Sequence, residues 1–299
     1  MLLRSWMIEM GWVCVSWRRN LACLVMALAA GAPPLGAQMA GLRTERLADS
    51  VYAIVRTTRP RDPSDANTLV IINDRDVVVV DGNITPQSTR EVIREIRKLT
   101  ANPVRYVIIT HFHSDHHTGN IEYRRAWPDV EFVAHVNTYQ DILDDDVVSF
   151  RRNVSKDYPD EIARLRGMLA RGTRSDGAAL SAAEREQAQS TIDAMAYFIA
   201  EASSFEPIPP TLTFGDSLVL RRGTRPIVVR YLGYGNTRGD VVVHLPKEGV
   251  LATGDLVVAP VPFAFGSFPL AWTTTLERLR ALPATVIMPG HGEPMRDWA

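Results

Sequence analysis

Residues 110–120 read THFHSDHHTGN and place four histidines and one aspartate within positions 111–117. The whole chain has seven histidines, so this stretch holds more than half of them. It directly follows VRYVIIT (104–110), a run of apolar and β-branched residues that predicts a buried strand. A polar loop at the end of a buried strand rests on a rigid scaffold, which can aim several side chains at one point.

The spacing within this loop suits metal binding. His111 and His113 point to the same side of an extended backbone, because side chains alternate along it. Asp115 and His116 follow on the next turn and can face a second point nearby. Imidazole and carboxylate together suit zinc, with manganese and iron as alternatives. The other interpretation is a histidine-rich surface loop, which this position disfavours. His117 must point elsewhere and is expected to be a spectator.

Composition limits the partners of the chain. It has 299 residues, 46% of them hydrophobic, and a formal net charge of -1. This length can bury one large core or two small ones. The near-neutral balance argues against nucleic acid or an anionic membrane as the main partner, since either favours a basic patch. We therefore expect a small-molecule substrate.

The first 37 residues have the pattern of a secretory signal peptide. Two arginines (18–19) precede the apolar run LACLVMALAAGA (21–32), and small residues follow. The apolar run is too short for a bilayer, which needs about 20 residues. Cleavage after Ala37 would leave a domain of residues 38–299 in the periplasm or outside the cell, with no stable membrane partner. An uncleaved N-terminal anchor is the alternative.

Both cysteines, Cys14 and Cys23, lie in this leader segment. The mature chain would then form no disulfide and offer no thiolate to a metal. The sequence ends eight residues after His291, so we expect any C-terminal helix to be either missing or cut off in this sequence.

The rest of the chain predicts two β-rich runs, each closed by a helix. A helix is expected after Thr85, a plausible N-cap with Pro86 at the first helical position. Residues 137–205 are polar and helical, with Pro159 opening one helix and Ser181 to Glu184 forming a capping box, and are interpreted as a helical insert. Strands are expected at 50–56, 67–73, 76–82, 104–110, 130–135, 216–223, 225–233, 240–246, 249–255 and 285–292, with a second helix at 273–282.

The ordered motifs resemble the metallo-β-lactamase superfamily over almost the whole mature chain. The HxHxDH motif stands at residues 111–116, and VVVVDG, LGYGNTRGDVVVHLP, LATGDLV and MPGHGEP follow the family order. This resemblance implies an α/β fold, an αββα sandwich of two mixed β-sheets flanked by helices, with the metal site at one edge. It also implies Zn²⁺ as the cofactor, one or two ions per chain.

The resemblance further implies the ligands. It would assign His111 and His113 to the first metal, with Asp255 between the two metals. The second metal would take Asp115, His116 and His291.

Asn236 departs from the family pattern, which has a histidine there. Its amide oxygen is a weak or absent ligand beside imidazole. Three outcomes of this substitution are possible. The site binds two metals with a weakened first position, or it binds a single metal at the second position, or catalysis is lost. His244 and His135 lie in or at the end of strands, and we interpret both as structural.

The expected chemistry is hydrolysis. A metal-bound hydroxide would attack a lactam, lactone or ester bond, and Asp115 would orient it and accept its proton. The alternative is a metal-poor, catalytically impaired periplasmic binding or accessory protein of the same fold. The aromatic loop at 260–272 is expected either to wall the site or to pack the insert onto the core, with four candidate side chains: Phe263, Phe265, Phe268 and Trp272.

Overall fold

The computed structural model describes residues 41–56, 65–202, 206–259, 262–264, 266–296 and 298. The expected signal peptide, both cysteines and Phe265 lie outside these residues. Among the described residues, every helix is too short or too polar to span a bilayer.

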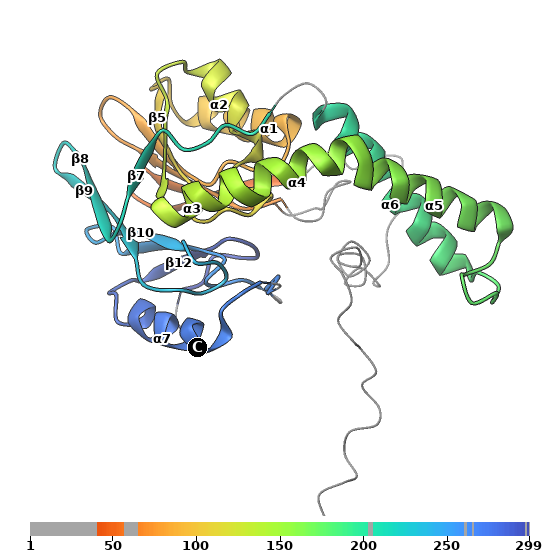
Figure 1. Ribbon diagram of the computed structural model, residues 1–299. Helices are drawn as coiled ribbons and strands as arrows, with labels where there is room; N and C mark the ends of the chain where they lie inside the picture. Colours follow the sequence, from red (N-terminus) through yellow and green to blue (C-terminus); the bar gives the residue numbers. More distant parts are fainter. Residues whose placement is uncertain are drawn as a thin grey trace, which may run out of the picture.

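Two stacked β-sheets form the body of the molecule (Figure 1). Their strands run antiparallel in part and parallel in part, so both sheets are mixed. The seven-stranded sheet has the order β1 (Leu42–Ala48), β2 (Val51–Arg56), β3 (Thr68–Ile72), β4 (Val77–Val80), β5 (Val104–Ile108), β6 (Glu131–His135) and β7 (Leu212–Phe214). The five-stranded sheet has the order β12 (Val286–Pro289), β11 (Val250–Gly254), β10 (Val241–Leu245), β9 (Arg225–Tyr231) and β8 (Ser217–Arg222).

Helices cover the outer face of each sheet. The helices α1 (Pro86–Leu99) and α2 (Ile121–Ala126) lie on the first sheet, and α7 (Pro269–Arg280) lies on the second (Figure 1). The expected αββα sandwich is thereby confirmed. The four valines of β4 show why its sequence is apolar throughout. Val78 and Val80 pack between the sheets, whereas Val77 and Val79 pack under the helices, so both faces of the strand are buried.

Two strands of the first sheet were not predicted. β1 reads LRTERLA and lies at one edge of the sheet, where most of its side chains are partly or fully exposed. β7 has three residues at the other edge. Edge strands bury little apolar surface and use charged residues to avoid pairing with other chains, so their sequences carry a weak strand signal.

The expected N-caps are present. Thr85 and Ser88 form a capping box at the start of α1, with Pro86 in its first turn. At the start of α6 (Ala182–Ala202), the Ser181 backbone N–H donates to Glu184 over 2.8 Å, and the Glu184 backbone N–H donates to Ser181 Oγ over 3.2 Å. One helix differs from expectation, because α7 begins at Pro269 rather than at residue 273.

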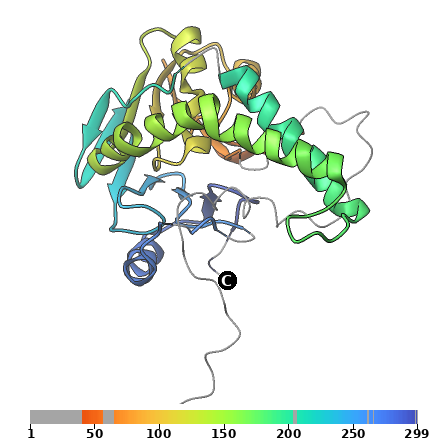
Figure 2. The same cartoon turned by 45° about the vertical axis from the view of Figure 1, so that its right-hand side comes forward.

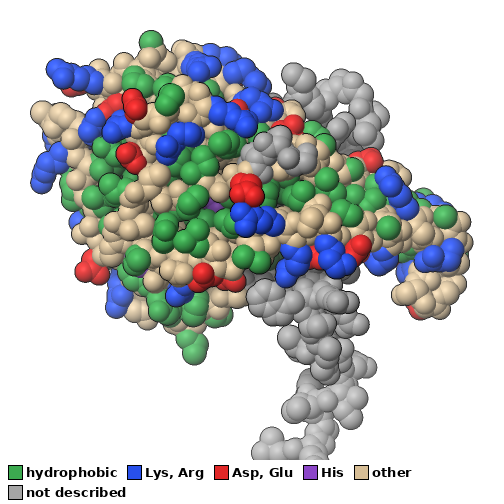
Figure 3. Space-filling model, turned by 45° about the horizontal axis from the view of Figure 1, so that its top comes forward, with side chains coloured by type: hydrophobic (Ala, Val, Ile, Leu, Met, Phe, Trp, Pro, Cys, Tyr) green, Lys and Arg blue, Asp and Glu red, His purple; other side chains and the backbone are tan. Residues whose placement is uncertain are grey.

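Helices occupy residues 136–171 and 182–202 between β6 and β7. The run starts with α3 (Val136–Asp141), a π-helical turn (Ile142–Asp146), α4 (Val147–Arg152), a second π-helical turn (Asn153–Asp157) and α5 (Tyr158–Arg171). Pro159 therefore lies in a run that is already helical, and does not open a new helix after a loop. The pair α5 and α6 projects from the sandwich (Figures 1 and 2). Acidic and basic side chains lie side by side along this arm (Figure 3).

Candidate metal centre

Side chains from three strand ends meet at one edge of the sandwich. The ligand loop, residues 110–117, follows β5 in the first sheet, whereas Asp255 and His291 follow β11 and β12 in the second. Backbone hydrogen bonds hold these ends together: Val241 N donates to Thr110 O over 2.9 Å, and Gly290 N donates to Gly254 O over 2.9 Å. The candidate centre therefore joins the two sheets.

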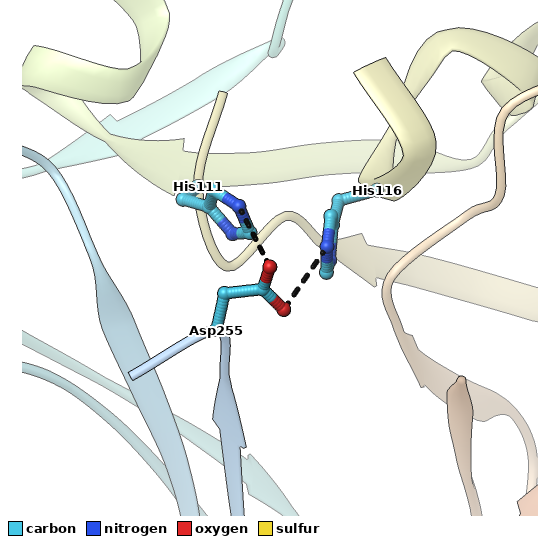
Figure 4. Close-up of side chains that lie close together, drawn as sticks. All are labelled: His111, His116 and Asp255. Atoms are coloured by element: carbon cyan, nitrogen blue, oxygen red, sulfur yellow. Dashed lines mark ion pairs between the residues drawn. The ribbon is translucent and has the colours of Figure 1, made fainter. Parts of the chain in front are cut away.

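One cluster of donors contains His111, His116 and Asp255, all of them buried. Both imidazole rings point at the carboxylate of Asp255 (Figure 4). Its Oδ2 lies 3.9 Å from Nε2 of His111, and its Oδ1 lies 3.4 Å from Nε2 of His116. Nδ1 of His113 lies 2.9 Å from Nε2 of His111, so His113 adjoins the same cluster.

A second cluster contains Asp115, His116 and His291. Oδ2 of Asp115 lies 3.3 Å from Nε2 of His116 and 3.0 Å from Nε2 of His291. Oδ1 of Asp255 lies 3.6 Å from Nε2 of His291. The second cluster matches the set expected for the second metal. His116 and Asp255 lie within reach of both clusters, which places the Asp255 carboxylate between them.

The donor atoms fit a bound metal. Ligands at 2.0–2.1 Å from a tetrahedral zinc are about 3.3 Å apart, and the shorter separations within the two clusters lie near that value. Nε2 of His116 and Oδ1 of Asp255 are buried and have no hydrogen-bond partner among the described residues. Buried polar atoms are normally satisfied, so an ion between them would supply the missing partner.

The surroundings shift the pKa values of His116 and His111 in opposite directions. Burial lowers the pKa of His116, but the carboxylates of Asp115, Asp81 and Asp255 outweigh it and hold that pKa well above its usual value. For His111, burial and the neighbouring His116 and His113 rings together hold the pKa well below its usual value. Burial also lowers the pKa of His113. In the metal-free protein the charged imidazolium form is therefore favoured at His116 and the neutral form at His111.

Asp115 and His291 form a charged pair at the outer side of the centre. Burial raises the pKa of Asp115, yet the charge of His116, together with the hydrogen bond and the charge of His291, overcomes it and holds the pKa well below its usual value. Burial lowers the pKa of His291, but the hydrogen bond to Asp115 and the charge of Asp255 raise it above its usual value. Asp115 is therefore ionised, as both a metal ligand and a proton acceptor must be.

Asp81 orients the ligand loop from the end of β4. Its Oδ1 accepts the Thr110 backbone N–H over 2.8 Å, and its Oδ2 lies 2.8 Å from Nδ1 of His116. A carboxylate on the far nitrogen of a ligand histidine fixes the ring and leaves Nε2 for the metal. Asp81 has a left-handed backbone, with φ of 64°, which few side chains tolerate as well as aspartate. The sequence motif VVVVDG contains Asp81, but the sequence did not indicate that its carboxylate orients His116.

Two glycines let the strand ends approach closely. Gly254 has φ of 51°, and a Cβ there would lie 2.5 Å from Oγ1 of Thr110. A Cβ on Gly290 would lie 2.0 Å from Oδ1 of Asp255. A larger residue at Gly254 would push the second sheet away from the ligand loop, and one at Gly290 would displace the Asp255 carboxylate.

Asn236 is 1% exposed, and both its amide atoms lack a hydrogen-bond partner among the described residues. Asp240 closes the same turn, accepting the Thr237 backbone N–H over 2.6 Å. Burial raises the pKa of Asp240 to about 7, against the hydrogen bonds from Thr237 that lower it. The turn is therefore buried and rich in polar atoms, although no histidine stands in it.

The remaining histidines make contacts away from the clusters. Nε2 of His117 lies 3.0 Å from the carbonyl oxygen of Phe112, and Nε2 of His244 lies 2.9 Å from that of Pro283. Nδ1 of His135 accepts the Asn137 backbone N–H over 3.1 Å. All three rings hold the local backbone.

The aromatic loop lines the site in only one place. The Phe263 ring lies 5.6 Å from the His113 ring, centroid to centroid. Phe268 instead packs on Tyr234 at 4.8 Å. Trp272, in α7, is partly buried against the core cluster under that helix and donates Nε1–H to the Leu256 carbonyl over 3.3 Å. The predicted aromatic wall is thus reduced to Phe263 among the described residues.

Comparison with known proteins agrees with this architecture. The profile of the Metallo-beta-lactamase superfamily matches residues 61–291. This match covers well over half of the chain and includes the ligand loop, Asp255 and His291. The chain belongs to the metallo-β-lactamase superfamily.

Its relatives include enzymes with different substrates. The linear primary-alkylsulfatase of Pseudomonas sp. (strain ATCC 19151) is 29% identical over 230 residues, which cover 73% of this chain and 40% of that protein. A type 2 metallo-beta-lactamase of Bacteroides fragilis is 29% identical over 116 residues, or 37% of this chain and 46% of that protein. The matches therefore span less than half the length of these two relatives.

Solved structures share the fold. The metallo-beta-lactamase from Pontibacter korlensis aligns with a TM-score of 0.56 at 18% identity, covering 86% of this chain and 94% of that chain. The DIM-1 metallo-beta-lactamase aligns with a TM-score of 0.54 at 19% identity, covering 85% and 91%.

Proposed function

We propose that this protein is a zinc-dependent hydrolase that cleaves a lactam, lactone or ester bond in a small molecule. One observation carries the proposal: five histidine and aspartate side chains, from strand ends of both sheets, form two adjoining clusters, and the donor atoms within each cluster lie within 4.8 Å of one another. His113 adjoins them through His111. The set contains only imidazole and carboxylate donors, which suits Zn²⁺.

The proposed ligands fall into two sets, one for each ion. His111, His113 and Asp255 would hold one ion, and Asp115, His116 and His291, again with Asp255, would hold another. A bound divalent metal lowers the pKa of a coordinated water towards 7 and polarises the bond under attack. Asp115 is ionised in this environment, so its carboxylate is able to orient the attacking water and accept its proton. Oδ1 would accept it, because Oδ2 is the oxygen that lies near His116 and His291.

The surroundings favour a substrate with an apolar part. Phe263 is 40% exposed and adjoins His113, and Tyr234 on a neighbouring loop is 42% exposed. The relatives act on primary alkyl sulfates in one case and are named β-lactamases in the others. The ester bond of the proposal therefore includes sulfate esters of alkyl chains.

We further propose that the protein works outside the cytoplasm after removal of residues 1–37. The apolar run behind two arginines supports this location. N-terminal sequencing of protein recovered from the periplasm of an expressing cell tests it, and a mature N-terminus at Gln38 is expected.

The decisive experiment combines metal analysis with a substrate panel. Purified protein is analysed for zinc, manganese and iron, and is then assayed with a chromogenic β-lactam, a lactone, an aryl ester and a primary alkyl sulfate. We expect bound zinc and turnover of at least one substrate, with loss of turnover after chelation and recovery on adding zinc. Bound zinc without any turnover would contradict the hydrolase proposal.

A second candidate is a metal-poor binding or accessory protein of the same fold. Asn236 favours this candidate. The family has a histidine at this position, whereas this chain has only an amide, which is a weaker zinc ligand. Protein that holds little zinc and turns over no member of the panel would support this candidate.

A further inference from the structure

The carboxylate of Asp146 contacts the ligand loop from the helical insert. Ser114 Oγ donates to Oδ1 of Asp146 over 2.5 Å. The other oxygen, Oδ2, is buried and lies 3.4 Å from Nε2 of His117. Asp146 itself is 7% exposed. Two donors of the ligand loop thus face the two oxygens of one buried carboxylate.

His117 lies beside this carboxylate without a hydrogen bond to it. Its Nε2 lies 3.0 Å from the carbonyl oxygen of Phe112, and a carbonyl can only accept. Nε2 therefore carries the proton and donates it to Phe112, and the polar N–H group attracts the carboxylate of Asp146 electrostatically across 3.4 Å. The ring is 0% exposed, so water does not screen this contact. His117 joins the loop to itself and to the insert without facing the candidate centre.

The same helical run also holds the turn that carries Asn236. Nδ2 of Asn137 donates to the Arg238 carbonyl over 2.8 Å, and Oγ1 of Thr138 donates to the Gly239 carbonyl over 2.8 Å. Nε of Arg238 donates to Asp141 over 2.7 Å. The start of the insert therefore contacts both the ligand loop and the opposite loop, one from each sheet.

The local helix geometry is unusual where the contact is made. Asp146 is the last residue of the π-helical turn Ile142–Asp146. π-helical turns are rare and are frequently found at functional sites. This turn is where the insert meets Ser114, which stands between two of the proposed ligands.

We propose that Asp146 is a positioning residue of the metal centre, which holds the ligand loop through Ser114 and His117 so that the donors of the loop converge. The insert is then part of the scaffold of the centre. The inference rests on the proposed metal binding, and it adds a residue outside the ligand set.

The test uses Asp146→Asn, which keeps the size of the side chain. The carboxylate offers two acceptor oxygens, whereas the amide offers only one. In the variant the NH₂ group would therefore face either Ser114 or His117. Zinc affinity is measured by chelator competition, and Co²⁺-substituted protein is examined by absorption spectroscopy. Loss of a hydrogen bond to a ligand itself typically costs 10–100-fold in metal affinity. Asp146 acts through Ser114 and His117, beside the ligands, so we expect the Kd for zinc to rise towards the lower end of that range, about 10-fold. The Co²⁺ ligand-field bands should also change.

Asp157→Asn is the matched control. Asp157 ends the second π-helical turn of the same insert and pairs with Arg152 over 2.8 Å, away from the ligand loop. We expect it to leave the zinc affinity and the Co²⁺ spectrum unchanged. A purely structural role for Asp146 would lower the melting temperature of the metal-free protein and leave the zinc Kd of the folded protein as in wild type, which would overturn the inference.

Ser114→Ala removes the same hydrogen bond from the loop side. It is expected to weaken zinc binding in the same direction, and it decides the question if Asp146→Asn does not fold. Wild-type affinity in Ser114→Ala and in every folded Asp146 variant would overturn the positioning role while leaving the proposed metal centre standing. Wild-type protein that binds no zinc or cobalt would overturn the proposed function and this inference together.

Discussion

Nε2 of His291 lies 3.0 Å from Oδ2 of Asp115, although one residue follows the last strand and the other lies in the loop after β5. The same aspartate oxygen lies 3.3 Å from Nε2 of His116. One carboxylate oxygen therefore joins the first and last metal motifs of the chain. This convergence is the geometric basis of the proposed hydrolase.

Asp115→Asn should abolish most of the hydrolytic activity. The amide cannot accept a proton, and general-base catalysis contributes about 10²–10⁴-fold to a rate. We expect kcat to fall within that range for any substrate that the wild type turns over, as measured by initial rates. The exposed Asp129→Asn serves as the control and should keep wild-type kcat. Full activity in Asp115→Asn would remove this residue from the mechanism.

Asn236→His should raise the metal content. Imidazole is a stronger zinc ligand than an amide oxygen, so the variant supplies the donor that the first position lacks. We expect wild-type protein to keep fewer than two firmly held zincs per chain after dialysis, and the variant to keep more, by elemental analysis. Asn236→Leu, of similar size and without a donor, should show no gain. Two firmly held zincs in the wild type would contradict the prediction.

Gly254→Ala should destabilise the protein more than Gly177→Ala does. Both glycines have positive φ, and an alanine in that conformation costs about 1–2 kcal/mol. At Gly177 a Cβ meets nothing within 4 Å, whereas at Gly254 it would lie 2.5 Å from Oγ1 of Thr110. We expect the difference in unfolding free energy between the variants to be about 1–3 kcal/mol, the range for local strain. Equal denaturant midpoints would argue against the close approach.

Asp240 should make stability depend on pH. Its pKa is raised by burial to about 7, above the value of about 3.9 in an unfolded chain. The stabilising contribution of the protonated form is therefore complete below about pH 4 and is lost as the pH rises through about 7. Relative to wild type, metal-free Asp240→Asn should gain stability between pH 4 and 8 in denaturant titrations. The exposed Asp216→Asn should show no such trend.

Much of the fold could be predicted from local patterns. The central strands are apolar throughout because both faces are covered, and Thr85 and Ser181 mark helix starts by their own hydrogen bonds. The π-helical turns and the contact of Asp146 with Ser114 could not be predicted, because both depend on how the insert packs against a distant loop. The position of Trp272 could not be predicted for the same reason. The local sequence around an aromatic residue does not tell whether the residue lines a site or packs against a core.

The two sheets contribute different members of the donor set, with the ligand loop from one and Asp255 and His291 from the other. A cation captured by all of them would cross-link the two layers. The second cluster cannot be complete until β12, the last strand, has docked beside β11. Metal binding at the proposed second site would therefore have to follow the docking of β12, in whichever compartment the chain completes its folding.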